Sequence, residues 1–183
     1  MDSYLYIMRH AKSDWSGSQT SDFERPINKR GKKSAKLIGQ WMNENSFIPE
    51  KIISSPATRA KETIELVIAQ IAKFNHEDLI FQNELYLAGF TQLIEIINTY
   101  KLNAQSLMLV GHNPGMENLV NYLCNQSGAS QTTVKTANLF IFKYADNNFN
   151  PAIDSCEFVN AIRPFRVSEK NGKRVLVLFR DLI

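Results

Sequence analysis

Histidines follow two of the short apolar segments in this sequence. Arg9 and His10 come directly after one apolar segment, and His112 stands two residues beyond another that ends at Val110. A histidine ring nitrogen can attack phosphorus and form a phosphohistidine intermediate, which water then hydrolyses. A second histidine, if protonated, can stabilise negative charge on the phosphoryl oxygens. These positions therefore suggest phosphoryl-transfer chemistry with a histidine nucleophile.

Arginines accompany these histidines. Arg9 precedes His10, and Arg59 falls in the opening turn of the helix expected after Ser54-Ser55-Pro56. The guanidinium group stays charged, and its forked donors match phosphoryl oxygens. The start of that helix adds free backbone N–H groups that favour an anion. His76, in a polar stretch, is expected at the surface.

Each of these residues has an ordinary explanation when taken alone. An Arg-His dipeptide is common, His112 would fit a hydrogen-bonded core histidine, and Arg59 would fit a solvated helix residue. What favours a site is that they follow three different predicted strands. In open α/β sheets, ligands bind beyond the carboxyl ends of the strands.

The elements that must position these residues follow from apolar periodicity. Short strand-like segments alternate with longer segments of helical spacing through the first two-thirds, and strands dominate the last third. We therefore expect a single domain over residues 1–183 with a three-layer α/β/α fold and a mainly parallel sheet with one antiparallel strand. The expected strands are Tyr4–Met8, Lys51–Ser54, Leu79–Phe81, Ser106–Val110, Asn138–Tyr144, Glu157–Ile162 and Arg174–Phe179. The expected helices are centred on residues 37–42, 64–71, 93–97 and 116–123, two of them preceded by Pro56 and Pro114.

Composition narrows the function further. The 183 residues carry a net charge of +3, with basic residues scattered among acidic ones, so we expect no nucleic-acid partner. The N-terminus does not resemble a signal peptide and no apolar run is long enough for a membrane span, so no membrane partner is expected. Cys124 and Cys156 form no metal or redox pattern, and as free thiols they favour a cytoplasmic location.

Four motifs, in order along the chain, resemble those of the histidine phosphatase superfamily, whose fold is the phosphoglycerate mutase-like fold. They are Leu5–Ser13, Glu24–Gly31, Ser54–Thr63 and Val110–Glu117. One position departs from the pattern: Ala11 stands where the superfamily usually has glycine, and alanine is also small.

The resemblance implies roles for particular residues. His10 would be the nucleophile, while Arg9, Arg59 and His112 would complete the phosphate pocket. Arg25 matches a position that approaches the phosphate in short members of the family. No cofactor and no metal are implied.

The absence of long insertions favours the SixA-like branch, whose members remove phosphate from phosphohistidine on signalling proteins. Only 25 positions separate Arg59 from Glu84. Glu84 matches the segment that supplies a proton donor in mutase-like relatives, and such an acid would assist ester hydrolysis. The weaker phosphorus–nitrogen bond of phosphohistidine needs an acid less. Asp14, close to His10, is expected to be a loop residue.

Other chemistries fit poorly. The chain lacks the Cys-x5-Arg pair, an Asp-x-Asp pair after the first strand, and a Gly-x4-Gly-Lys-Ser/Thr loop, and three histidines are few for a metallohydrolase. Two alternatives stay open: a phosphatase of a small phosphate monoester, and a non-catalytic module that binds phosphorylated ligands. The oligomeric state is not indicated.

Overall fold

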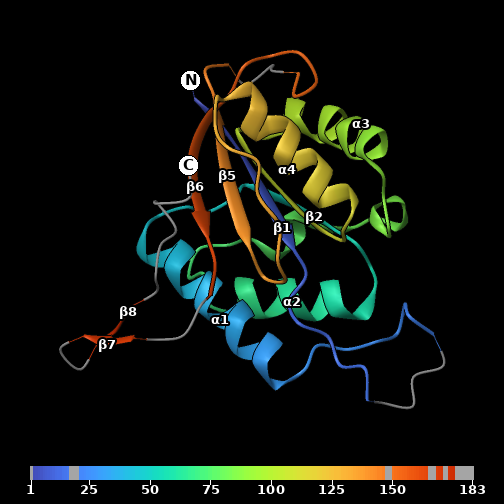
Figure 1. Cartoon of the computed structure of the whole chain (residues 1–183), viewed down its shortest axis with the longest axis vertical. Helices are drawn as coiled ribbons and strands as arrows, with labels where there is room; N and C mark the ends of the chain where they lie inside the picture. The colour runs from blue at the N-terminus through green and yellow to red at the C-terminus, as the bar shows by residue number, and fades with distance from the viewer. Residues whose placement is uncertain (1, 17–20, 147–149, 165–167, 171–172, 176–183) are drawn as a thin grey trace.

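A six-stranded sheet runs through the middle of the computed structural model, which describes residues 2–16, 21–146, 150–164, 168–170 and 173–175 (Figure 1). The strand order is β3-β2-β4-β1-β5-β6, and β5 is antiparallel to both of its neighbours, whereas the other neighbouring strands run parallel. The predicted sheet with one antiparallel strand is therefore confirmed. The strands are β1 (Ser3–Arg9), β2 (Lys51–Ser54), β3 (Leu79–Phe81), β4 (Ser106–Gly111), β5 (Leu139–Tyr144) and β6 (Glu157–Ile162).

Helices cover both faces of this sheet, so the fold has three layers (Figure 1). On one face lie α1 (Lys29–Glu44) and α2 (Thr58–Ile68), and on the other α3 (Phe90–Tyr100) and α4 (Gly115–Gln126). Leu107 and Leu109 of β4 pack in the α3–α4 layer, and Met108 and Val110 pack in the α1–α2 layer. Because this strand is buried on both faces, its sequence is a continuous apolar run.

The last part of the chain adds a small two-stranded hairpin, β7 (Ser168–Lys170) and β8 (Lys173–Val175), which lies apart from the main sheet in Figure 1. The strand predicted at Arg174–Phe179 overlaps β8 only at its start. Its remaining positions, 176–179, lie outside the described residues. The single-domain organisation over residues 1–183 stays a prediction.

The register of the three central strands fixes where the site forms. Arg9 of β1 lies beside Gly111 of β4, and Ser54 of β2 lies beside Val110 of β4. The carboxyl ends of β2, β4 and β1 therefore reach the same edge of the sheet. Pro56 and Pro114 each stand between one of these strands and the helix that follows, as predicted.

Close packing between α1 and α2 depends on a glycine. A side-chain carbon at Gly39 would collide with the carbonyl oxygen of Val67, which is backbone and cannot swing away. We predict that Gly39→Ala destabilises the protein by about 1–3 kcal/mol, because the two helices must move apart. Urea unfolding followed by circular dichroism measures this change.

Gly89→Ala is the matched control, since an added carbon at that position meets nothing within 4 Å. Equal unfolding midpoints for the two variants would show that the helix contact tolerates a methyl group.

Candidate active site

The backbone around His10 is held by the sheet. The His10 N–H donates to the Gly111 carbonyl at 3.0 Å, and the Ala137 N–H lies 3.1 Å from the carbonyl oxygens of both Arg9 and His10. The residue is 6 % exposed. These hydrogen bonds extend the ladder of β1 past its last residue, so His10 is positioned with the rigidity of a strand.

One hydrogen bond fixes the proton arrangement of the His10 ring. Nδ1 lies 2.8 Å from the Ala11 carbonyl oxygen, and a carbonyl can only accept, so Nδ1 carries the hydrogen. The Ala11 N–H in turn donates to the Thr63 hydroxyl at 2.9 Å, which holds this peptide in place. Nε2 is therefore the nitrogen without a hydrogen, and its electron pair can accept a hydrogen bond or attack phosphorus.

Arg59, the second residue of α2, faces that electron pair. Its Nε donates to His10 Nε2 at 3.3 Å, and its side chain is 2 % exposed. The other end of the guanidinium donates to Asp22: Nη1 to the backbone oxygen at 2.6 Å and Nη2 to the carboxylate at 2.9 Å. The arginine is thus pinned beside the nucleophile.

His112 lies next to His10, with a distance of 5.0 Å between the ring centroids. Its Nε2 is 2.8 Å from the Ser55 hydroxyl, and the Tyr86 ring packs edge-on against it at 5.4 Å. The structure therefore brings together His10, Arg59 and His112, which the sequence placed after three separate strands.

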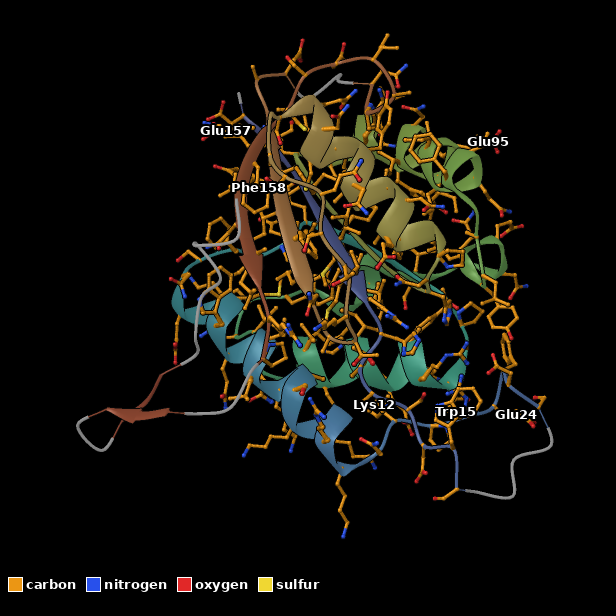
Figure 2. The ribbon with its side chains drawn as sticks, viewed as in Figure 1. Lys12, Trp15, Glu24, Glu95, Glu157 and Phe158 are labelled. Atoms are coloured by element: carbon orange, nitrogen blue, oxygen red, sulfur yellow. The ribbon has the colours of Figure 1, made fainter. Side chains whose placement is uncertain are left out.

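Arg25 and Arg9 complete the surroundings. Arg25 is buried, donates to Ser13 and Asp22, and stacks on Trp15 with 3.6 Å between guanidinium carbon and ring centroid. Figure 2 shows Trp15 on the segment that joins β1 to α1. Arg9 donates from Nη1 to the Val134 carbonyl at 2.8 Å.

Three nitrogens at this site have no partner among the described residues. They are Arg9 Nε, Arg25 Nε and His112 Nδ1, and all three are buried. Buried polar atoms without partners are uncommon in folded proteins. Here they belong to the residues whose charge and geometry suit a phosphoryl group, whose oxygens could accept from them.

Burial keeps both imidazoles neutral in the free protein. Desolvation, with the nearby charges of Arg59, Arg9 and Arg25, lowers the pKa of His10 to about 3. Desolvation also lowers the pKa of His112 to about 3, helped by His10 and Arg59. The condition that His112 be protonated is therefore not met in the free protein. A bound phosphoryl dianion would act in the opposite direction on this pKa.

Glu84 lies outside this cluster. It is exposed on a short 3₁₀ helix, η2 (Asn83–Leu85), and within the described part of the chain no hydrogen bond or ion pair holds its carboxylate. Tyr86, two residues later, is the member of this segment that reaches the site, since its hydroxyl donates to Asp22 at 3.0 Å. Asp14 caps the turn at Ser16, as expected of a loop residue.

Sequence reasoning missed Asp22 and Tyr86 and gave no role to Ser55 or Thr63. The sequence contained weak indications for two of these residues, Asp22 and Tyr86. Asp22 stands three residues before Arg25, and Tyr86 lies in the segment considered for Glu84.

Among the described residues there is neither a candidate metal site nor a candidate membrane-spanning helix. Across the described ranges, no three His, Cys, Asp or Glu side chains gather so that they could hold a metal ion. In the same ranges, no helix has both the length and the apolar character to cross a bilayer. Cys124 and Cys156 are buried free thiols, as predicted.

Comparison with known proteins gives a consistent result. Residues 5–84 match the model of the histidine phosphatase superfamily (branch 1). An uncharacterized chloroplastic protein of Arabidopsis thaliana is 32 % identical over 155 residues, which cover 81 % of this chain and 69 % of that protein. The cytoplasmic location stays a prediction, since this relative is chloroplastic.

Two further matches are to proteins named SixA. The phosphohistidine phosphatase SixA of Escherichia coli is 24 % identical over 155 residues, or 83 % of this chain and 94 % of that protein. The crystal structure of a putative phosphohistidine phosphatase SixA from Agrobacterium tumefaciens has a TM-score of 0.74 at 24 % identity, with 88 % of this chain and 98 % of that one covered. The structural match shows the shared fold. The chain belongs to the histidine phosphatase superfamily, branch 1, and is a phosphatase.

Proposed function

We propose that this phosphatase removes the phosphoryl group from phosphohistidine on a protein, through a phosphoenzyme formed at His10. The observation that carries the proposal is the arrangement of the His10 ring. Nδ1–H is committed to the Ala11 carbonyl, and Nε2 faces the Arg59 guanidinium. When a phosphoryl group binds beside Arg59, its oxygen would take over the Arg59 N–H that donates to Nε2 in the free protein, and the electron pair of Nε2 would then be open to phosphorus.

The reaction has two displacements. In the first, Nε2 of His10 forms a bond to phosphorus while the bond from phosphorus to the substrate nitrogen breaks, and the leaving imidazole takes a proton from water. In the second, water attacks the phosphorus of the phosphorylated His10, the bond from phosphorus to Nε2 breaks, and inorganic phosphate leaves. The proton lost by this water neutralises the hydroxide formed in the first step, and Nε2 recovers its electron pair. The Ala11 carbonyl stabilises the positive ring of the intermediate through Nδ1–H.

The surrounding hydrogen-bond donors would stabilise the negative charge of the phosphoryl oxygens. Arg59 and Arg9 would bind equatorial oxygens, with Arg25 and His112 as further donors through their unpartnered nitrogens. Each preorganised donor of this kind contributes about 3–4 kcal/mol to transition-state stabilisation in studied enzymes.

The substrate class rests on two lines of support. The Escherichia coli relative and the Agrobacterium tumefaciens structure, which has a TM-score of 0.74, carry the name phosphohistidine phosphatase SixA, the second as a putative one. In addition, no carboxylic acid of the described residues is hydrogen-bonded to His10. Although desolvation raises the pKa of Asp22, hydrogen bonds from Arg25 and Tyr86 lower it overall, so this carboxylate is poorly suited to give a proton to a leaving alkoxide. An imidazole leaving group needs such a donor less.

The first prediction concerns the nucleophile. His10→Ala should lower turnover of a phosphohistidine-bearing protein by roughly 10⁴-fold or more, because the covalent route is lost. Turnover is measured as inorganic phosphate released. Wild-type enzyme is quenched in alkaline detergent, separated from the ³²P-phosphoprotein by gel electrophoresis, and tested for a label that is stable in base and lost in acid.

His76→Ala is the matched control, since this third histidine is exposed on a turn away from the site. Undiminished activity in His10→Ala would refute the mechanism. Efficient hydrolysis of small phosphate monoesters but not of the phosphoprotein would keep His10 and replace the substrate, and absence of any turnover would favour a binding module.

The second prediction concerns Glu84, whose role as proton donor stays a prediction from the sequence. Because its carboxylate is exposed and unpartnered, Glu84→Gln should change the kcat for phosphohistidine protein by less than about threefold, far below the 10²–10⁴-fold range of general acids. The same variant is assayed on an alkyl phosphate, whose poor leaving group needs a proton. A drop of about 10²-fold on the ester alone would establish Glu84 as its donor.

The third prediction concerns pH. Since the pKa values of His10 and His112 are lowered to about 3, their ring resonances in ¹⁵N NMR should not titrate between pH 7.5 and 5. In the unfolded chain these rings take up protons near pH 6.5, so the histidines make folding less favourable as pH falls below that value. Variants at each histidine assign the signals, and a midpoint near pH 6.5 for either ring would contradict the burial argument.

A further inference from the structure

Asp22 contacts two arginines of the site, although it belongs to none of the groups that would touch phosphorus or its oxygens. We propose that Asp22 is a positioning residue, which orients Arg59 and Arg25 toward the phosphoryl group. Its consequence for catalysis rests on the proposed function, but its consequence for phosphate binding does not.

The first argument is the way in which Asp22 holds Arg59. The backbone oxygen and the carboxylate of Asp22 accept from Nη1 and Nη2, at 2.6 and 2.9 Å. Nε, at another edge of the planar group, points to His10 Nε2 at 3.3 Å. Asp22 therefore occupies one edge of the guanidinium and leaves the edge that contains Nε toward the nucleophile.

The second argument is that the same carboxylate spans two arginines. Oδ1 accepts from Arg25 Nη2 at 2.6 Å, and Oδ2 accepts from Arg59 Nη2. The Tyr86 hydroxyl adds a third donor at 3.0 Å. An arginine side chain has many rotamers, and fixing it before the substrate arrives removes that ordering cost from binding.

The third argument concerns charge. Arg9, Arg25 and Arg59 are gathered at one buried site, where like charges repel more strongly than in water. The Asp22 carboxylate, held ionised by hydrogen bonds, offsets this repulsion between Arg25 and Arg59. Without it, the long side chains could separate toward solvent.

The segment that carries Asp22 is itself anchored. The Thr58 N–H at the start of α2 donates to the Phe23 carbonyl at 3.0 Å, and the Phe23 ring packs on Tyr86 with 5.0 Å between centroids. This attachment favours a carboxylate that stays in place over one that the substrate displaces. If the carboxylate orients the arginines, removing its charge should weaken phosphate binding. If phosphate has to displace it, removing its charge should strengthen phosphate binding.

The decisive variant is Asp22→Asn, which keeps the shape and removes the charge. Calorimetric titration with inorganic phosphate, at pH 7.5 and fixed ionic strength, should show binding weakened about tenfold, and kcat with the phosphoprotein should fall by about 10²-fold with a smaller change in KM. Asp14→Asn is the control, since this carboxylate lies on the same segment between β1 and α1 but accepts from Ser16 and Trp15 and forms no ion pair with the arginines of the site among the described residues. Melting temperatures of both variants exclude loss of folded protein.

A double-mutant cycle tests the route through Arg59. If Asp22 acts by orienting this arginine, then Asp22→Asn should weaken phosphate binding much less in an Arg59→Ala background than in the wild type. Asp22→Glu, which keeps the charge, should recover part of the lost affinity.

Two results would overturn the proposal. Tighter phosphate binding by Asp22→Asn would show that the carboxylate competes with phosphate, and unchanged binding would show that it has no role there. Wild-type protein that binds phosphate without hydrolysing the phosphoprotein would contradict the proposed function while leaving this binding test intact.

Discussion

The structure depends on three parallel strands that end at the same edge of the sheet. The pairing of β1 with β4 and of β2 with β4 fixes the heights of the strand ends, and the residues that follow them inherit this alignment. His10, His112 and the turn before Arg59 can therefore meet although about 100 residues separate the first two along the chain. The two helical layers stabilise the site indirectly, because they bury both faces of these strands.

The alignment of the strand ends brings several positively charged side chains together, and local contacts offset part of the repulsion between them. Arginines are gathered beside two imidazoles in a region largely screened from water, and burial keeps the imidazoles neutral. Neutrality serves the chemistry, because a protonated Nε2 would have no electron pair for attack. The remaining positive charge and the unpartnered nitrogens are what an anionic substrate can use. The clustered positive charge and the unpartnered nitrogens lower the stability of the free protein, and the same features favour the binding of a phosphoryl group.

Much of this arrangement could be predicted from the amino-acid sequence. The bounds of β1 to β6 agree with the expected strands to within one residue at each end. For β1 and β4 the reason is that a strand buried on two faces is a continuous apolar run. The convergence of His10, Arg59 and His112 followed from the same reasoning, since each stands just beyond a strand.

The remainder depends on how loops fold back, which local patterns do not encode. Asp22 is one of several polar residues in a connecting segment, and nothing in its neighbours distinguishes a solvated carboxylate from one that bridges two arginines. Glu84 and Tyr86 differ by two positions, and only the turn at η2 decides which side chain is directed inward. The sequence allowed His112 to be either a core histidine or a site residue, and its burial beside His10 depends on how the strands are arranged.

Ala11, at the position where the sequence departs from the motif it resembles, has a consequence for the orientation of the nucleophile. The residue is fully buried, its methyl group packs in the α1–α2 layer, and its backbone holds both Thr63 and the His10 ring. Alanine has fewer accessible backbone conformations than glycine in the unfolded chain, so less freedom is lost when this peptide is ordered. The alignment of the reactive nitrogen is therefore established when the polypeptide folds, and the substrate meets a ring that is already oriented.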